Sequence, residues 1–262
     1  MITLLKLGGS LITDKNKAHT AQTDVIKRLG DEIFSVWNRE RFPLILGHGS
    51  GSFGHIPAKR YGTRNGVRTA AEWAGFAEVH AEATALNRIV TDILREAGLP
   101  VISFVPMDSV RTADGRVSAW DTAVILECIR QDLIPLIFGD TVFDSVRGGT
   151  ILSTEDLFVH LCETLPEPPR ILLAGLEAGV WADFPENTRL IPVIHAEGSD
   201  DDAAIKGSEF PDVTGGMQEK VNLMKELIRS GRAGSAEIVS GAGGSTLLQA
   251  LNNKPAGTLI IN

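Results

Sequence analysis

A lysine lies beside a glycine turn close to the start of the chain. The sequence runs Lys6-Leu7-Gly8-Gly9-Ser10 directly after the apolar residues Leu4 and Leu5. Glycines at the end of a strand let consecutive backbone amides turn toward an anion, and a neighbouring lysine adds a positive charge for a phosphoryl group. The segment is not a Walker A loop, because the GxxxxGK[ST] spacing is absent. A chance lysine at a turn is the alternative, but a charge inside an apolar strand is costly without a partner, which favours phosphate binding.

A second glycine-rich segment, His48-Gly49-Ser50-Gly51-Ser52-Phe53-Gly54-His55, follows the apolar run Pro43–Leu46. Ligand sites in open α/β sheets lie beyond the carboxyl ends of the strands, so two such turns predict one shared pocket. His55 could donate a hydrogen bond to a phosphate oxygen. A surface or helix-capping histidine is the alternative, and the surrounding glycines favour the first interpretation.

A third segment, Asp212-Val213-Thr214-Gly215-Gly216-Met217-Gln218-Glu219-Lys220, places glycines at the start of a helical pattern. The amino-terminal end of a helix is positive and attracts anions, and Lys220 follows one turn later. An ordinary capped helix with a solvated lysine is the alternative for this segment taken alone.

The elements that must position these residues alternate between short β-rich runs and helical patterns. This order is typical of a mostly parallel sheet covered by helices on both faces. Helices are predicted at about Thr23–Glu40, Thr69–Ala97, Asp121–Gln131, from Ser153, and at Gly216–Ser230. Strands are predicted at Ile2–Leu7, Pro43–Leu46, Val101–Val105, Ile134–Phe138, Ile171–Ala174, Ala236–Ser240 and Thr258–Ile261, and hairpins near Asp114-Gly115 and Arg147-Gly148-Gly149. Tyr61–Arg68 is expected to be a mobile loop, Ser199–Asp202 an acidic loop, and Pro166–Pro169 a boundary between two lobes.

Composition limits the kinds of partner. The formal charge of −8 argues against a nucleic-acid partner, because binding a phosphate backbone needs a net basic face, although a local basic pocket is not excluded. No stretch reaches the roughly 18 to 20 apolar residues that span a bilayer, and no leader pattern precedes the first strand. Cys128 and Cys162 lack metal-ligand spacing and are expected to be buried, reduced thiols. A cytoplasmic protein without a membrane partner is therefore expected.

Together these segments resemble the amino acid kinase family, and within it the isopentenyl phosphate kinases. The resemblance covers nearly the whole chain and includes Asp14-Lys15 and Gly139-Asp140 with Asp144. The ending Ser52-Phe53-Gly54-His55 is its most specific part. It resembles the branch that phosphorylates phosphates or phosphonates, and fosfomycin kinases have a similar loop. The implied fold is a three-layer αβα sandwich with a mostly parallel central sheet.

The resemblance implies a role for each matching residue. Lys6 and Lys220 neutralise the transferring phosphoryl group, Lys15 stabilises the transition state and His55 holds the acceptor phosphate. The family's acidic residue that orients the lysines corresponds to Glu155 in this sequence, and Asp156 lies next to it. The nucleotide contacts are expected from Gly8, Gly9, Ser10, Gly51, Gly175, Gly179, Gly216 and Lys220, and the acceptor contacts from Ser50, Gly54, His55 and Gly139. Residues 1–165 would bind the acceptor, and residues 166–262 would bind ATP together with Mg²⁺. No metal site formed by the protein alone is expected. The protein is expected to form a homodimer.

Three departures from the family pattern stand out. The nucleotide loop Thr-Asp-Val-Asp-Gly is replaced by Gly175-Leu176-Glu177-Ala178-Gly179, which lacks both aspartates and leaves nucleotide affinity and base preference open. The lysine-organising acid is a glutamate instead of an aspartate. The second glycine loop reads Gly49-Ser50-Gly51 instead of three glycines. None of these changes removes a residue expected to touch the transferred group.

The function implied is in-line transfer from Mg·ATP to isopentenyl phosphate, which gives isopentenyl diphosphate and ADP. An acceptor phosphate is already anionic at neutral pH, so no general base is needed. Two alternatives stay open, namely a kinase of another phosphate or a fosfomycin-like phosphonate, and a catalytically inactive ligand sensor. A stripe at helical spacing could wall the prenyl tail or simply pack the core; it consists of Phe76, Val79, Ala83 and Leu86.

Overall fold

The structure is a computed structural model that describes residues 1–197 and 216–262. The acidic loop expected at 199–202 and the first four residues of the third glycine segment, 212–215, lie outside the described residues.

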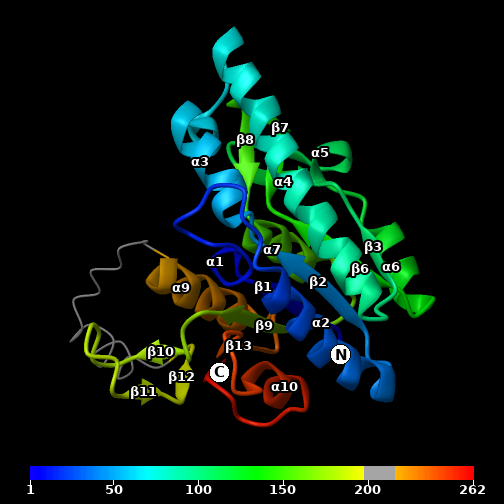
Figure 1. Cartoon of the computed structure of the whole chain (residues 1–262), viewed down its shortest axis with the longest axis vertical. Coiled ribbons are helices and arrows are strands. Elements are labelled where there is room, and N and C mark those ends of the chain that lie inside the picture. Colours follow the sequence, from blue (N-terminus) through cyan, green and yellow to red (C-terminus); the bar gives the residue numbers. More distant parts are fainter. Residues whose placement is uncertain (198–215) are drawn as a thin grey trace.

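A central sheet of eight strands organises the described part of the chain (Figure 1). Neighbouring strands run parallel except for one antiparallel pair, β13 with β14, which confirms the predicted mostly parallel α/β architecture. In spatial order the strands are β12 (Val193–His195), β14 (Thr258–Ile261), β13 (Ser235–Ser240), β9 (Arg170–Gly175), β1 (Thr3–Leu7), β2 (Leu44–His48), β6 (Ile134–Phe138) and β3 (Val101–Ser103).

The order of the strands divides the sheet by sequence. The strands β1, β2, β6 and β3 all precede Pro166, whereas β9, β13, β14 and β12 all follow it. The division falls between β1 and β9, whose backbones pair with Lys6 opposite Leu173. The first strand of the chain is therefore the seam between the two halves of the sheet.

Helices cover both faces of this sheet and form two separate cores. One face packs against α2 (Thr23–Glu40), α4 (Ala70–Glu96) and α10 (Thr246–Leu251). The other packs against α6 (Ala123–Arg130), α7 (Thr154–Thr164) and α9 (Gly216–Arg229). The three-layer αβα sandwich implied by the sequence is thus confirmed.

Side-chain alternation along β1 decides where Lys6 points. Leu5 and Leu7 belong to the core on the α2 side, whereas Leu4 belongs to the core on the α7 side. Because successive side chains of a strand point to opposite faces, Lys6 shares the face of Leu4. The lysine is therefore directed toward α7 at the carboxyl end of its strand.

Local sequence signals account for the two longest helices. In α4, Thr69 and Glu72 form the predicted capping box, in which the Glu72 amide donates to Thr69 Oγ1 at 3.3 Å and the Thr69 amide donates to Glu72 Oε2 at 2.8 Å. In α2, the predicted stripe is fully or nearly fully buried; it consists of Ile26, Leu29, Ile33, Val36 and Trp37.

A smaller sheet lies beside the main one and contains both predicted hairpins. The order of its strands is β5 (Arg116–Ala119), β4 (Arg111–Ala113), β7 (Asp140–Asp144) and β8 (Gly148–Leu152). One buried carboxylate, that of Asp144, connects the two hairpin turns. Asp144 is 4% exposed and accepts hydrogen bonds at 2.7–3.1 Å from the backbone amides of Asp114, Gly115, Val146 and Arg147. Burial opposes the charge of Asp144, but these hydrogen bonds outweigh it and hold the pKa of the carboxyl far below its ordinary value.

Asp144→Asn should lower the free energy of unfolding by about 2–3 kcal/mol, because the amide group places a donor where the carboxylate accepts. The folded-state pKa of Asp144 is lowered, so its contribution is present above the unfolded pKa of about 3.9 and is lost as the pH falls below it. Urea titrations at pH 7 and below pH 4 measure both effects. Asp114→Asn is the matched control, because Asp114 lies in the neighbouring β4–β5 turn and its carboxylate is exposed. Equal losses in the two variants at pH 7 would contradict the role of Asp144.

Some segments differ from expectation. The glycine-rich segment 47–55 is not all loop, because β2 continues to His48 and α3 (Gly51–Tyr61) begins at Gly51. The segment 61–68 contains a short 3-10 helix (Thr63–Asn65) whose Thr63 is fully buried. The strand expected at 101–105 ends at Ser103. Short elements that were not predicted are α1 (Gly9–Ile12), α5 (Pro106–Ser109), β10 (Val180–Trp181), β11 (Leu190–Ile191) and β12.

Two further expectations can be compared with the structure. Cys128 and Cys162 are buried and not disulfide-bonded, as predicted. Across residues 1–197 and 216–262, no helix combines the length and the apolar character that a bilayer crossing requires.

Candidate active site

The two amino-terminal glycine turns meet directly at the carboxyl ends of β1 and β2. The Gly8 amide donates to Ala174 O at 2.8 Å, and the Gly49 amide donates to Leu7 O at 3.0 Å. A methyl group on Gly9 would lie 2.5 Å from the Gly51 backbone nitrogen, which is closer than any real contact. Glycine is therefore required at Gly9 by the approach of the second loop, independently of any ligand.

A cavity of about 810 Å³ opens where these turns meet β9 and α9. It brings together most of the residues expected to act on phosphates, contributed by β1, α1, α3, α7, β9, α9 and the loops that hold Lys15 and Gly179. These residues are Lys6, Gly8, Gly9, Ser10, Lys15, Gly51, His55, Glu155, Asp156, Gly175, Gly179, Gly216 and Lys220.

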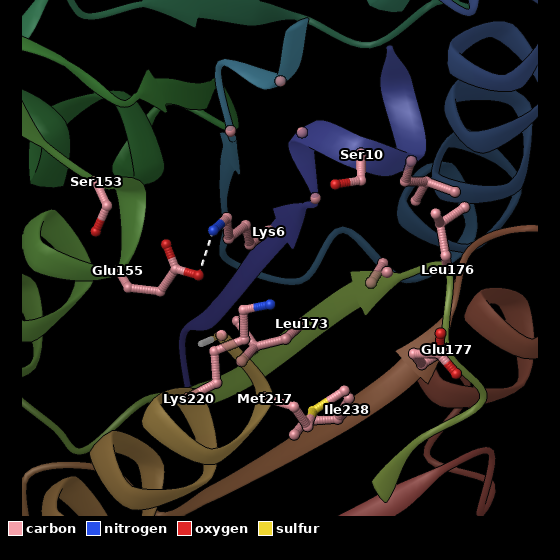
Figure 2. A pocket seen from close by; sticks show the side chains of 18 of the residues that line it. Lys6, Ser10, Ser153, Glu155, Leu173, Leu176, Glu177, Met217, Lys220 and Ile238 are labelled. Atoms are coloured by element: carbon pink, nitrogen blue, oxygen red, sulfur yellow. Dashed lines mark ion pairs between the residues drawn. The ribbon is translucent and has the colours of Figure 1, made fainter. Parts of the chain in front are cut away.

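Lys6 and Glu155 form an ion pair inside the cavity (Figure 2). Their side chains are 12% and 10% exposed, and Glu155 comes from the first turn of α7, opposite β1. Burial raises the pKa of Glu155, but the charge and hydrogen bond of Lys6, aided by Lys220, reverse this effect and lower the pKa. The carboxylate is therefore ionised at neutral pH and holds the lysine at the end of its strand.

Lys220 reaches the same space from the opposite side. It lies in the first turns of α9 and projects toward the cavity that Lys6 enters from β1 (Figure 2). After the larger effects of burial and of Lys6, the charge of Lys220 also lowers the pKa of Glu155. Two lysines from separate elements thus surround one buried carboxylate.

His55 lies in α3 at the edge of this positive region. Its side chain has an exposed surface, yet protein atoms crowd around it within the concave site. This desolvation, followed by the charges of Lys6, Lys15 and Arg64, lowers the pKa of His55 below its ordinary value. The ring is therefore neutral at pH 7 and can donate one N–H to an anion.

Lys15 lies in a loop that is anchored by a backbone bridge at its base and by the side chain of His19. An isolated bridge joins Thr13 to Ala21 at the base. Close to this bridge, His19 Nδ1 lies 2.8 Å from Glu82 Oε2 of α4, and the His19 ring packs edge-on against Phe53 of α3 at 5.5 Å. These contacts connect the loop of Lys15 to α4 and to α3, which lines the cavity.

Three residues expected to contact phosphates lie behind the cavity wall. The Ser50 hydroxyl donates to Gly139 O at 2.9 Å and so connects the second glycine loop to the end of β6. A methyl group on Gly54 would lie 2.7 Å from Ser50 Cβ. In the described structure Ser50, Gly54 and Gly139 therefore shape the loop from behind, while Gly51 and His55 face the cavity.

Phe76 and its stripe also lie away from the cavity. Phe76 is 4% exposed and packs against Trp73 and Phe143, with ring centroids 5.2 and 5.6 Å apart. Val79, Ala83 and Leu86 are equally buried. The stripe packs the interior in this structure, and its role toward a prenyl tail stays a prediction.

Phe76→Ala should lower the free energy of unfolding by about 3–5 kcal/mol, because it removes a buried aromatic ring. The preference for acceptor chain length should not change if the stripe only packs the interior. Thermal unfolding together with turnover of isopentenyl phosphate and longer prenyl phosphates separates the two roles. Increased turnover of longer acceptors would instead identify Phe76 as the end of a tail pocket.

Several residues on the cavity wall were not predicted from sequence. Arg64 extends into the cavity from the short helix after α3, and Trp181 and Phe184 border it near β10. The Trp181 indole donates to Glu177 Oε2 at 3.0 Å, so the segment 175–179, which lacks the family's two aspartates, still places a carboxylate on the cavity wall. The flanking glycines Gly62 and Gly66 were the only sequence signal that Arg64 lies on a shaped turn.

The cavity has two chemically different ends. One end is cationic and glycine-rich, whereas the end near β9 and β13 is mostly apolar, formed by Leu173, Leu176, Met217, Leu223 and Ile238. Figure 2 shows Leu176, Met217 and Ile238 on this side, together with Glu177. A ligand with a charged phosphate chain and a flat apolar base matches both ends.

The described residues include no group of three or more side chains placed to hold a metal ion. Mg²⁺ keeps several waters and is commonly bound through substrate phosphates, so it does not need a protein cage.

Fold and site together define a phosphotransferase of a known class. The family model for the amino acid kinase family matches residues 1–240, and the chain belongs to that family.

Within the family, the chain is similar to isopentenyl phosphate kinases. It is 31% identical to the enzyme of Methanocaldococcus jannaschii over 239 residues, 86% of this chain and 87% of that one. It is 32% identical to the enzyme of Methanothermobacter thermautotrophicus over 249 residues, 91% of each chain. A solved isopentenyl phosphate kinase structure, 28% identical, superimposes with a TM-score of 0.82 and covers 99% of this chain and 100% of that one. The resemblance seen in the sequence motifs is confirmed.

Proposed function

We propose that the protein transfers the γ-phosphoryl group of ATP to isopentenyl phosphate and produces isopentenyl diphosphate and ADP. The observation that carries the proposal is the cavity in which Lys6, Lys220 and His55 surround the glycine turns. A phosphoryl-transfer site must bind two polyanions in line, and such a site depends on charge neutralisation and positioning. The similarity to isopentenyl phosphate kinases supports this choice of acceptor.

The transfer uses the side chains in distinct ways. An acceptor phosphate oxygen forms a bond to the γ-phosphorus while the bond to the bridging oxygen of ADP breaks. Lys6, fixed by Glu155, and Lys220 neutralise the charge that is shared in the transition state. The backbone amides of Gly9 and Ser10 would donate to the phosphates, whereas the Gly8 amide is already bonded to Ala174 O. Mg²⁺ bound to the nucleotide would supply further positive charge.

His55 and Lys15 act on the acceptor side of the site. His55 donates to the acceptor phosphate as a neutral imidazole, because its pKa is lowered. Lys15 adds a positive charge from its anchored loop. The acceptor would thus be held by residues 1–165, and ATP by residues 166–262 together with the first glycine turn.

One observation supports a second candidate. Of the described residues before Pro166 that line the cavity, only Leu11 and Ile56 carry aliphatic side chains. A small phosphate or a fosfomycin-like phosphonate needs no apolar tail pocket, so this wall suits such an acceptor as well. The tail pocket expected at Phe76 is closed in this structure.

A coupled assay of ADP release over a panel of acceptors tests both candidates. The panel contains isopentenyl phosphate, dimethylallyl phosphate, longer prenyl phosphates and fosfomycin. The highest kcat/KM is expected with isopentenyl phosphate. Preference for fosfomycin would select the second candidate, and no turnover of any acceptor would favour an inactive ligand sensor.

The setting of the enzyme is part of the proposal. We place the reaction in the cytoplasm, with the enzyme as a homodimer, as the family resemblance implies. Light scattering coupled to size exclusion measures the mass in solution, and a mass near the 28.1 kDa of one chain would contradict the dimer.

A further inference from the structure

Arg64 lies on the cavity wall although it belongs to a short connection between α3 and α4. Its backbone is fixed within that connection. Thr63 is fully buried, and Arg64 O accepts a hydrogen bond from the Thr150 hydroxyl of β8 at 3.0 Å. The turn closes at Gly66, whose φ of 127° suits glycine and whose amide donates to Thr63 O at 3.3 Å. The arginine therefore extends from a defined position on the protein surface.

Among the described residues, Arg64 forms only a weak ion pair, with Asp156. Arg64 Nη2 is 3.6 Å from Asp156 Oδ2, beyond hydrogen-bond distance. The same oxygen already accepts from the Ser153 amide at 2.7 Å and from the Ser153 hydroxyl at 2.8 Å, which cap α7. With a side chain that is 65% exposed, Arg64 keeps most of its five donors directed toward solvent or an incoming anion.

Arg64 also belongs to the acceptor half of the cavity. Arg64 and His55 both line the cavity, and the charge of Arg64 contributes to the lowered pKa of His55. The wall of the other half comes from β9, β13 and α9, and neither Arg64 nor its anchor at Thr150 belongs to these elements. An anion bound by His55 would thus lie within the electrostatic reach of Arg64.

We propose that Arg64 is an acceptor-binding residue that grips the phosphate or phosphonate dianion together with His55. A planar guanidinium binds such a group through two parallel hydrogen bonds, which a lysine cannot reproduce. When the acceptor enters, Arg64 turns from Asp156 toward the stronger anion, and Asp156 keeps its bonds to Ser153. The proposal rests on the proposed function for the identity of the acceptor.

The first experiment compares Arg64→Met and Arg64→Lys with Arg60→Met. Arg60 is a matched control, because it is 58% exposed, pairs with Glu78 at 3.1 Å and does not line the cavity. In Arg64→Met, KM for isopentenyl phosphate should rise about tenfold or more, while KM for ATP stays unchanged. Arg64→Lys should recover part of the loss, and Arg60→Met should behave like the parent. An unchanged acceptor KM in Arg64→Met, or an equal rise in Arg60→Met, would overturn the proposal.

A second experiment separates this proposal from the proposed function. Isopentenyl phosphate is titrated by calorimetry into the parent and the same variants without nucleotide. If Arg64→Met is the only variant that binds isopentenyl phosphate more weakly, Arg64 is an acceptor-binding residue even if the parent shows no turnover. Absence of turnover by the parent would overturn only the proposed function. Equal binding by the parent and Arg64→Met would overturn the assignment even if the parent is an active kinase.

Discussion

Lys6→Met lowers kcat by about 10² to 10³ and changes KM for the acceptor much less. Removing one preorganised donor to a developing charge commonly costs this factor. Lys220→Met should show a similar loss, because Lys220 faces the same carboxylate from α9. Steady-state kinetics of ADP release measures both variants, and Lys59→Met, an exposed lysine of α3 away from the cavity wall, is the control.

Loss of folding must be separated from loss of catalysis in this experiment. Lys6→Met leaves Glu155 as a buried charge without its partner, which can cost about 3–5 kcal/mol of stability. The double variant Lys6→Met/Glu155→Gln removes both charges and should regain most of the melting temperature. Its kcat should stay low. If the double variant also regained kcat, the role of Lys6 would be structural.

His55→Ala raises KM for the acceptor about 10- to 150-fold, because a charge-assisted hydrogen bond to a phosphate is worth about 1.5–3 kcal/mol. KM for ATP should change little. His55→Gln keeps a neutral donor and should recover part of the loss. His55 lies inside α3 and caps neither end of it, so the remaining alternative is a surface histidine, whose replacement would leave the acceptor KM alone.

The lowered pKa of His55 gives this prediction a second readout. The pKa of His55 is lowered in the free enzyme, mainly by desolvation, which favours the neutral ring. A bound phosphate dianion would stabilise the protonated ring and raise its pKa. Acceptor binding at about pH 6 should therefore take up protons. Calorimetry in buffers of different ionisation enthalpy measures the uptake, which His55→Gln should reduce. Equal proton uptake in the parent and this variant would assign the proton to another group.

Much of the fold could be predicted because local and global signals agree. The capping box at Thr69 and the apolar stripe of α2 specify helices regardless of their surroundings. The helix α3 was not predicted, because Gly51, Gly54 and Pro57 lower helix propensity and its stability depends on tertiary burial of Phe53. The two-residue strands β10 and β11 exist only by pairing with each other, so they leave no local pattern.

Some residues of the site could be predicted from the sequence and others could not. Lys6 was detectable because a charge in an apolar strand is costly, and the structure supplies its partner in Glu155. Arg64 was not, because a lone arginine between two glycines has the same sequence pattern as any solvated arginine. Phe76 lay between these cases, since a buried apolar stripe has the same spacing whether it packs a core or walls a pocket.

The position of β1 at the seam of the sheet has a consequence for how the molecule is made. β1 can pair with β2 as soon as residue 48 has left the ribosome, but its other neighbour, β9, begins only at Arg170. Until then the nascent chain carries an open, apolar strand edge, which is an opportunity for wrong pairing. The bond from the Gly8 amide to Ala174 O also waits for β9. The phosphate turn therefore reaches its final geometry late in synthesis, although it is encoded in the first ten residues.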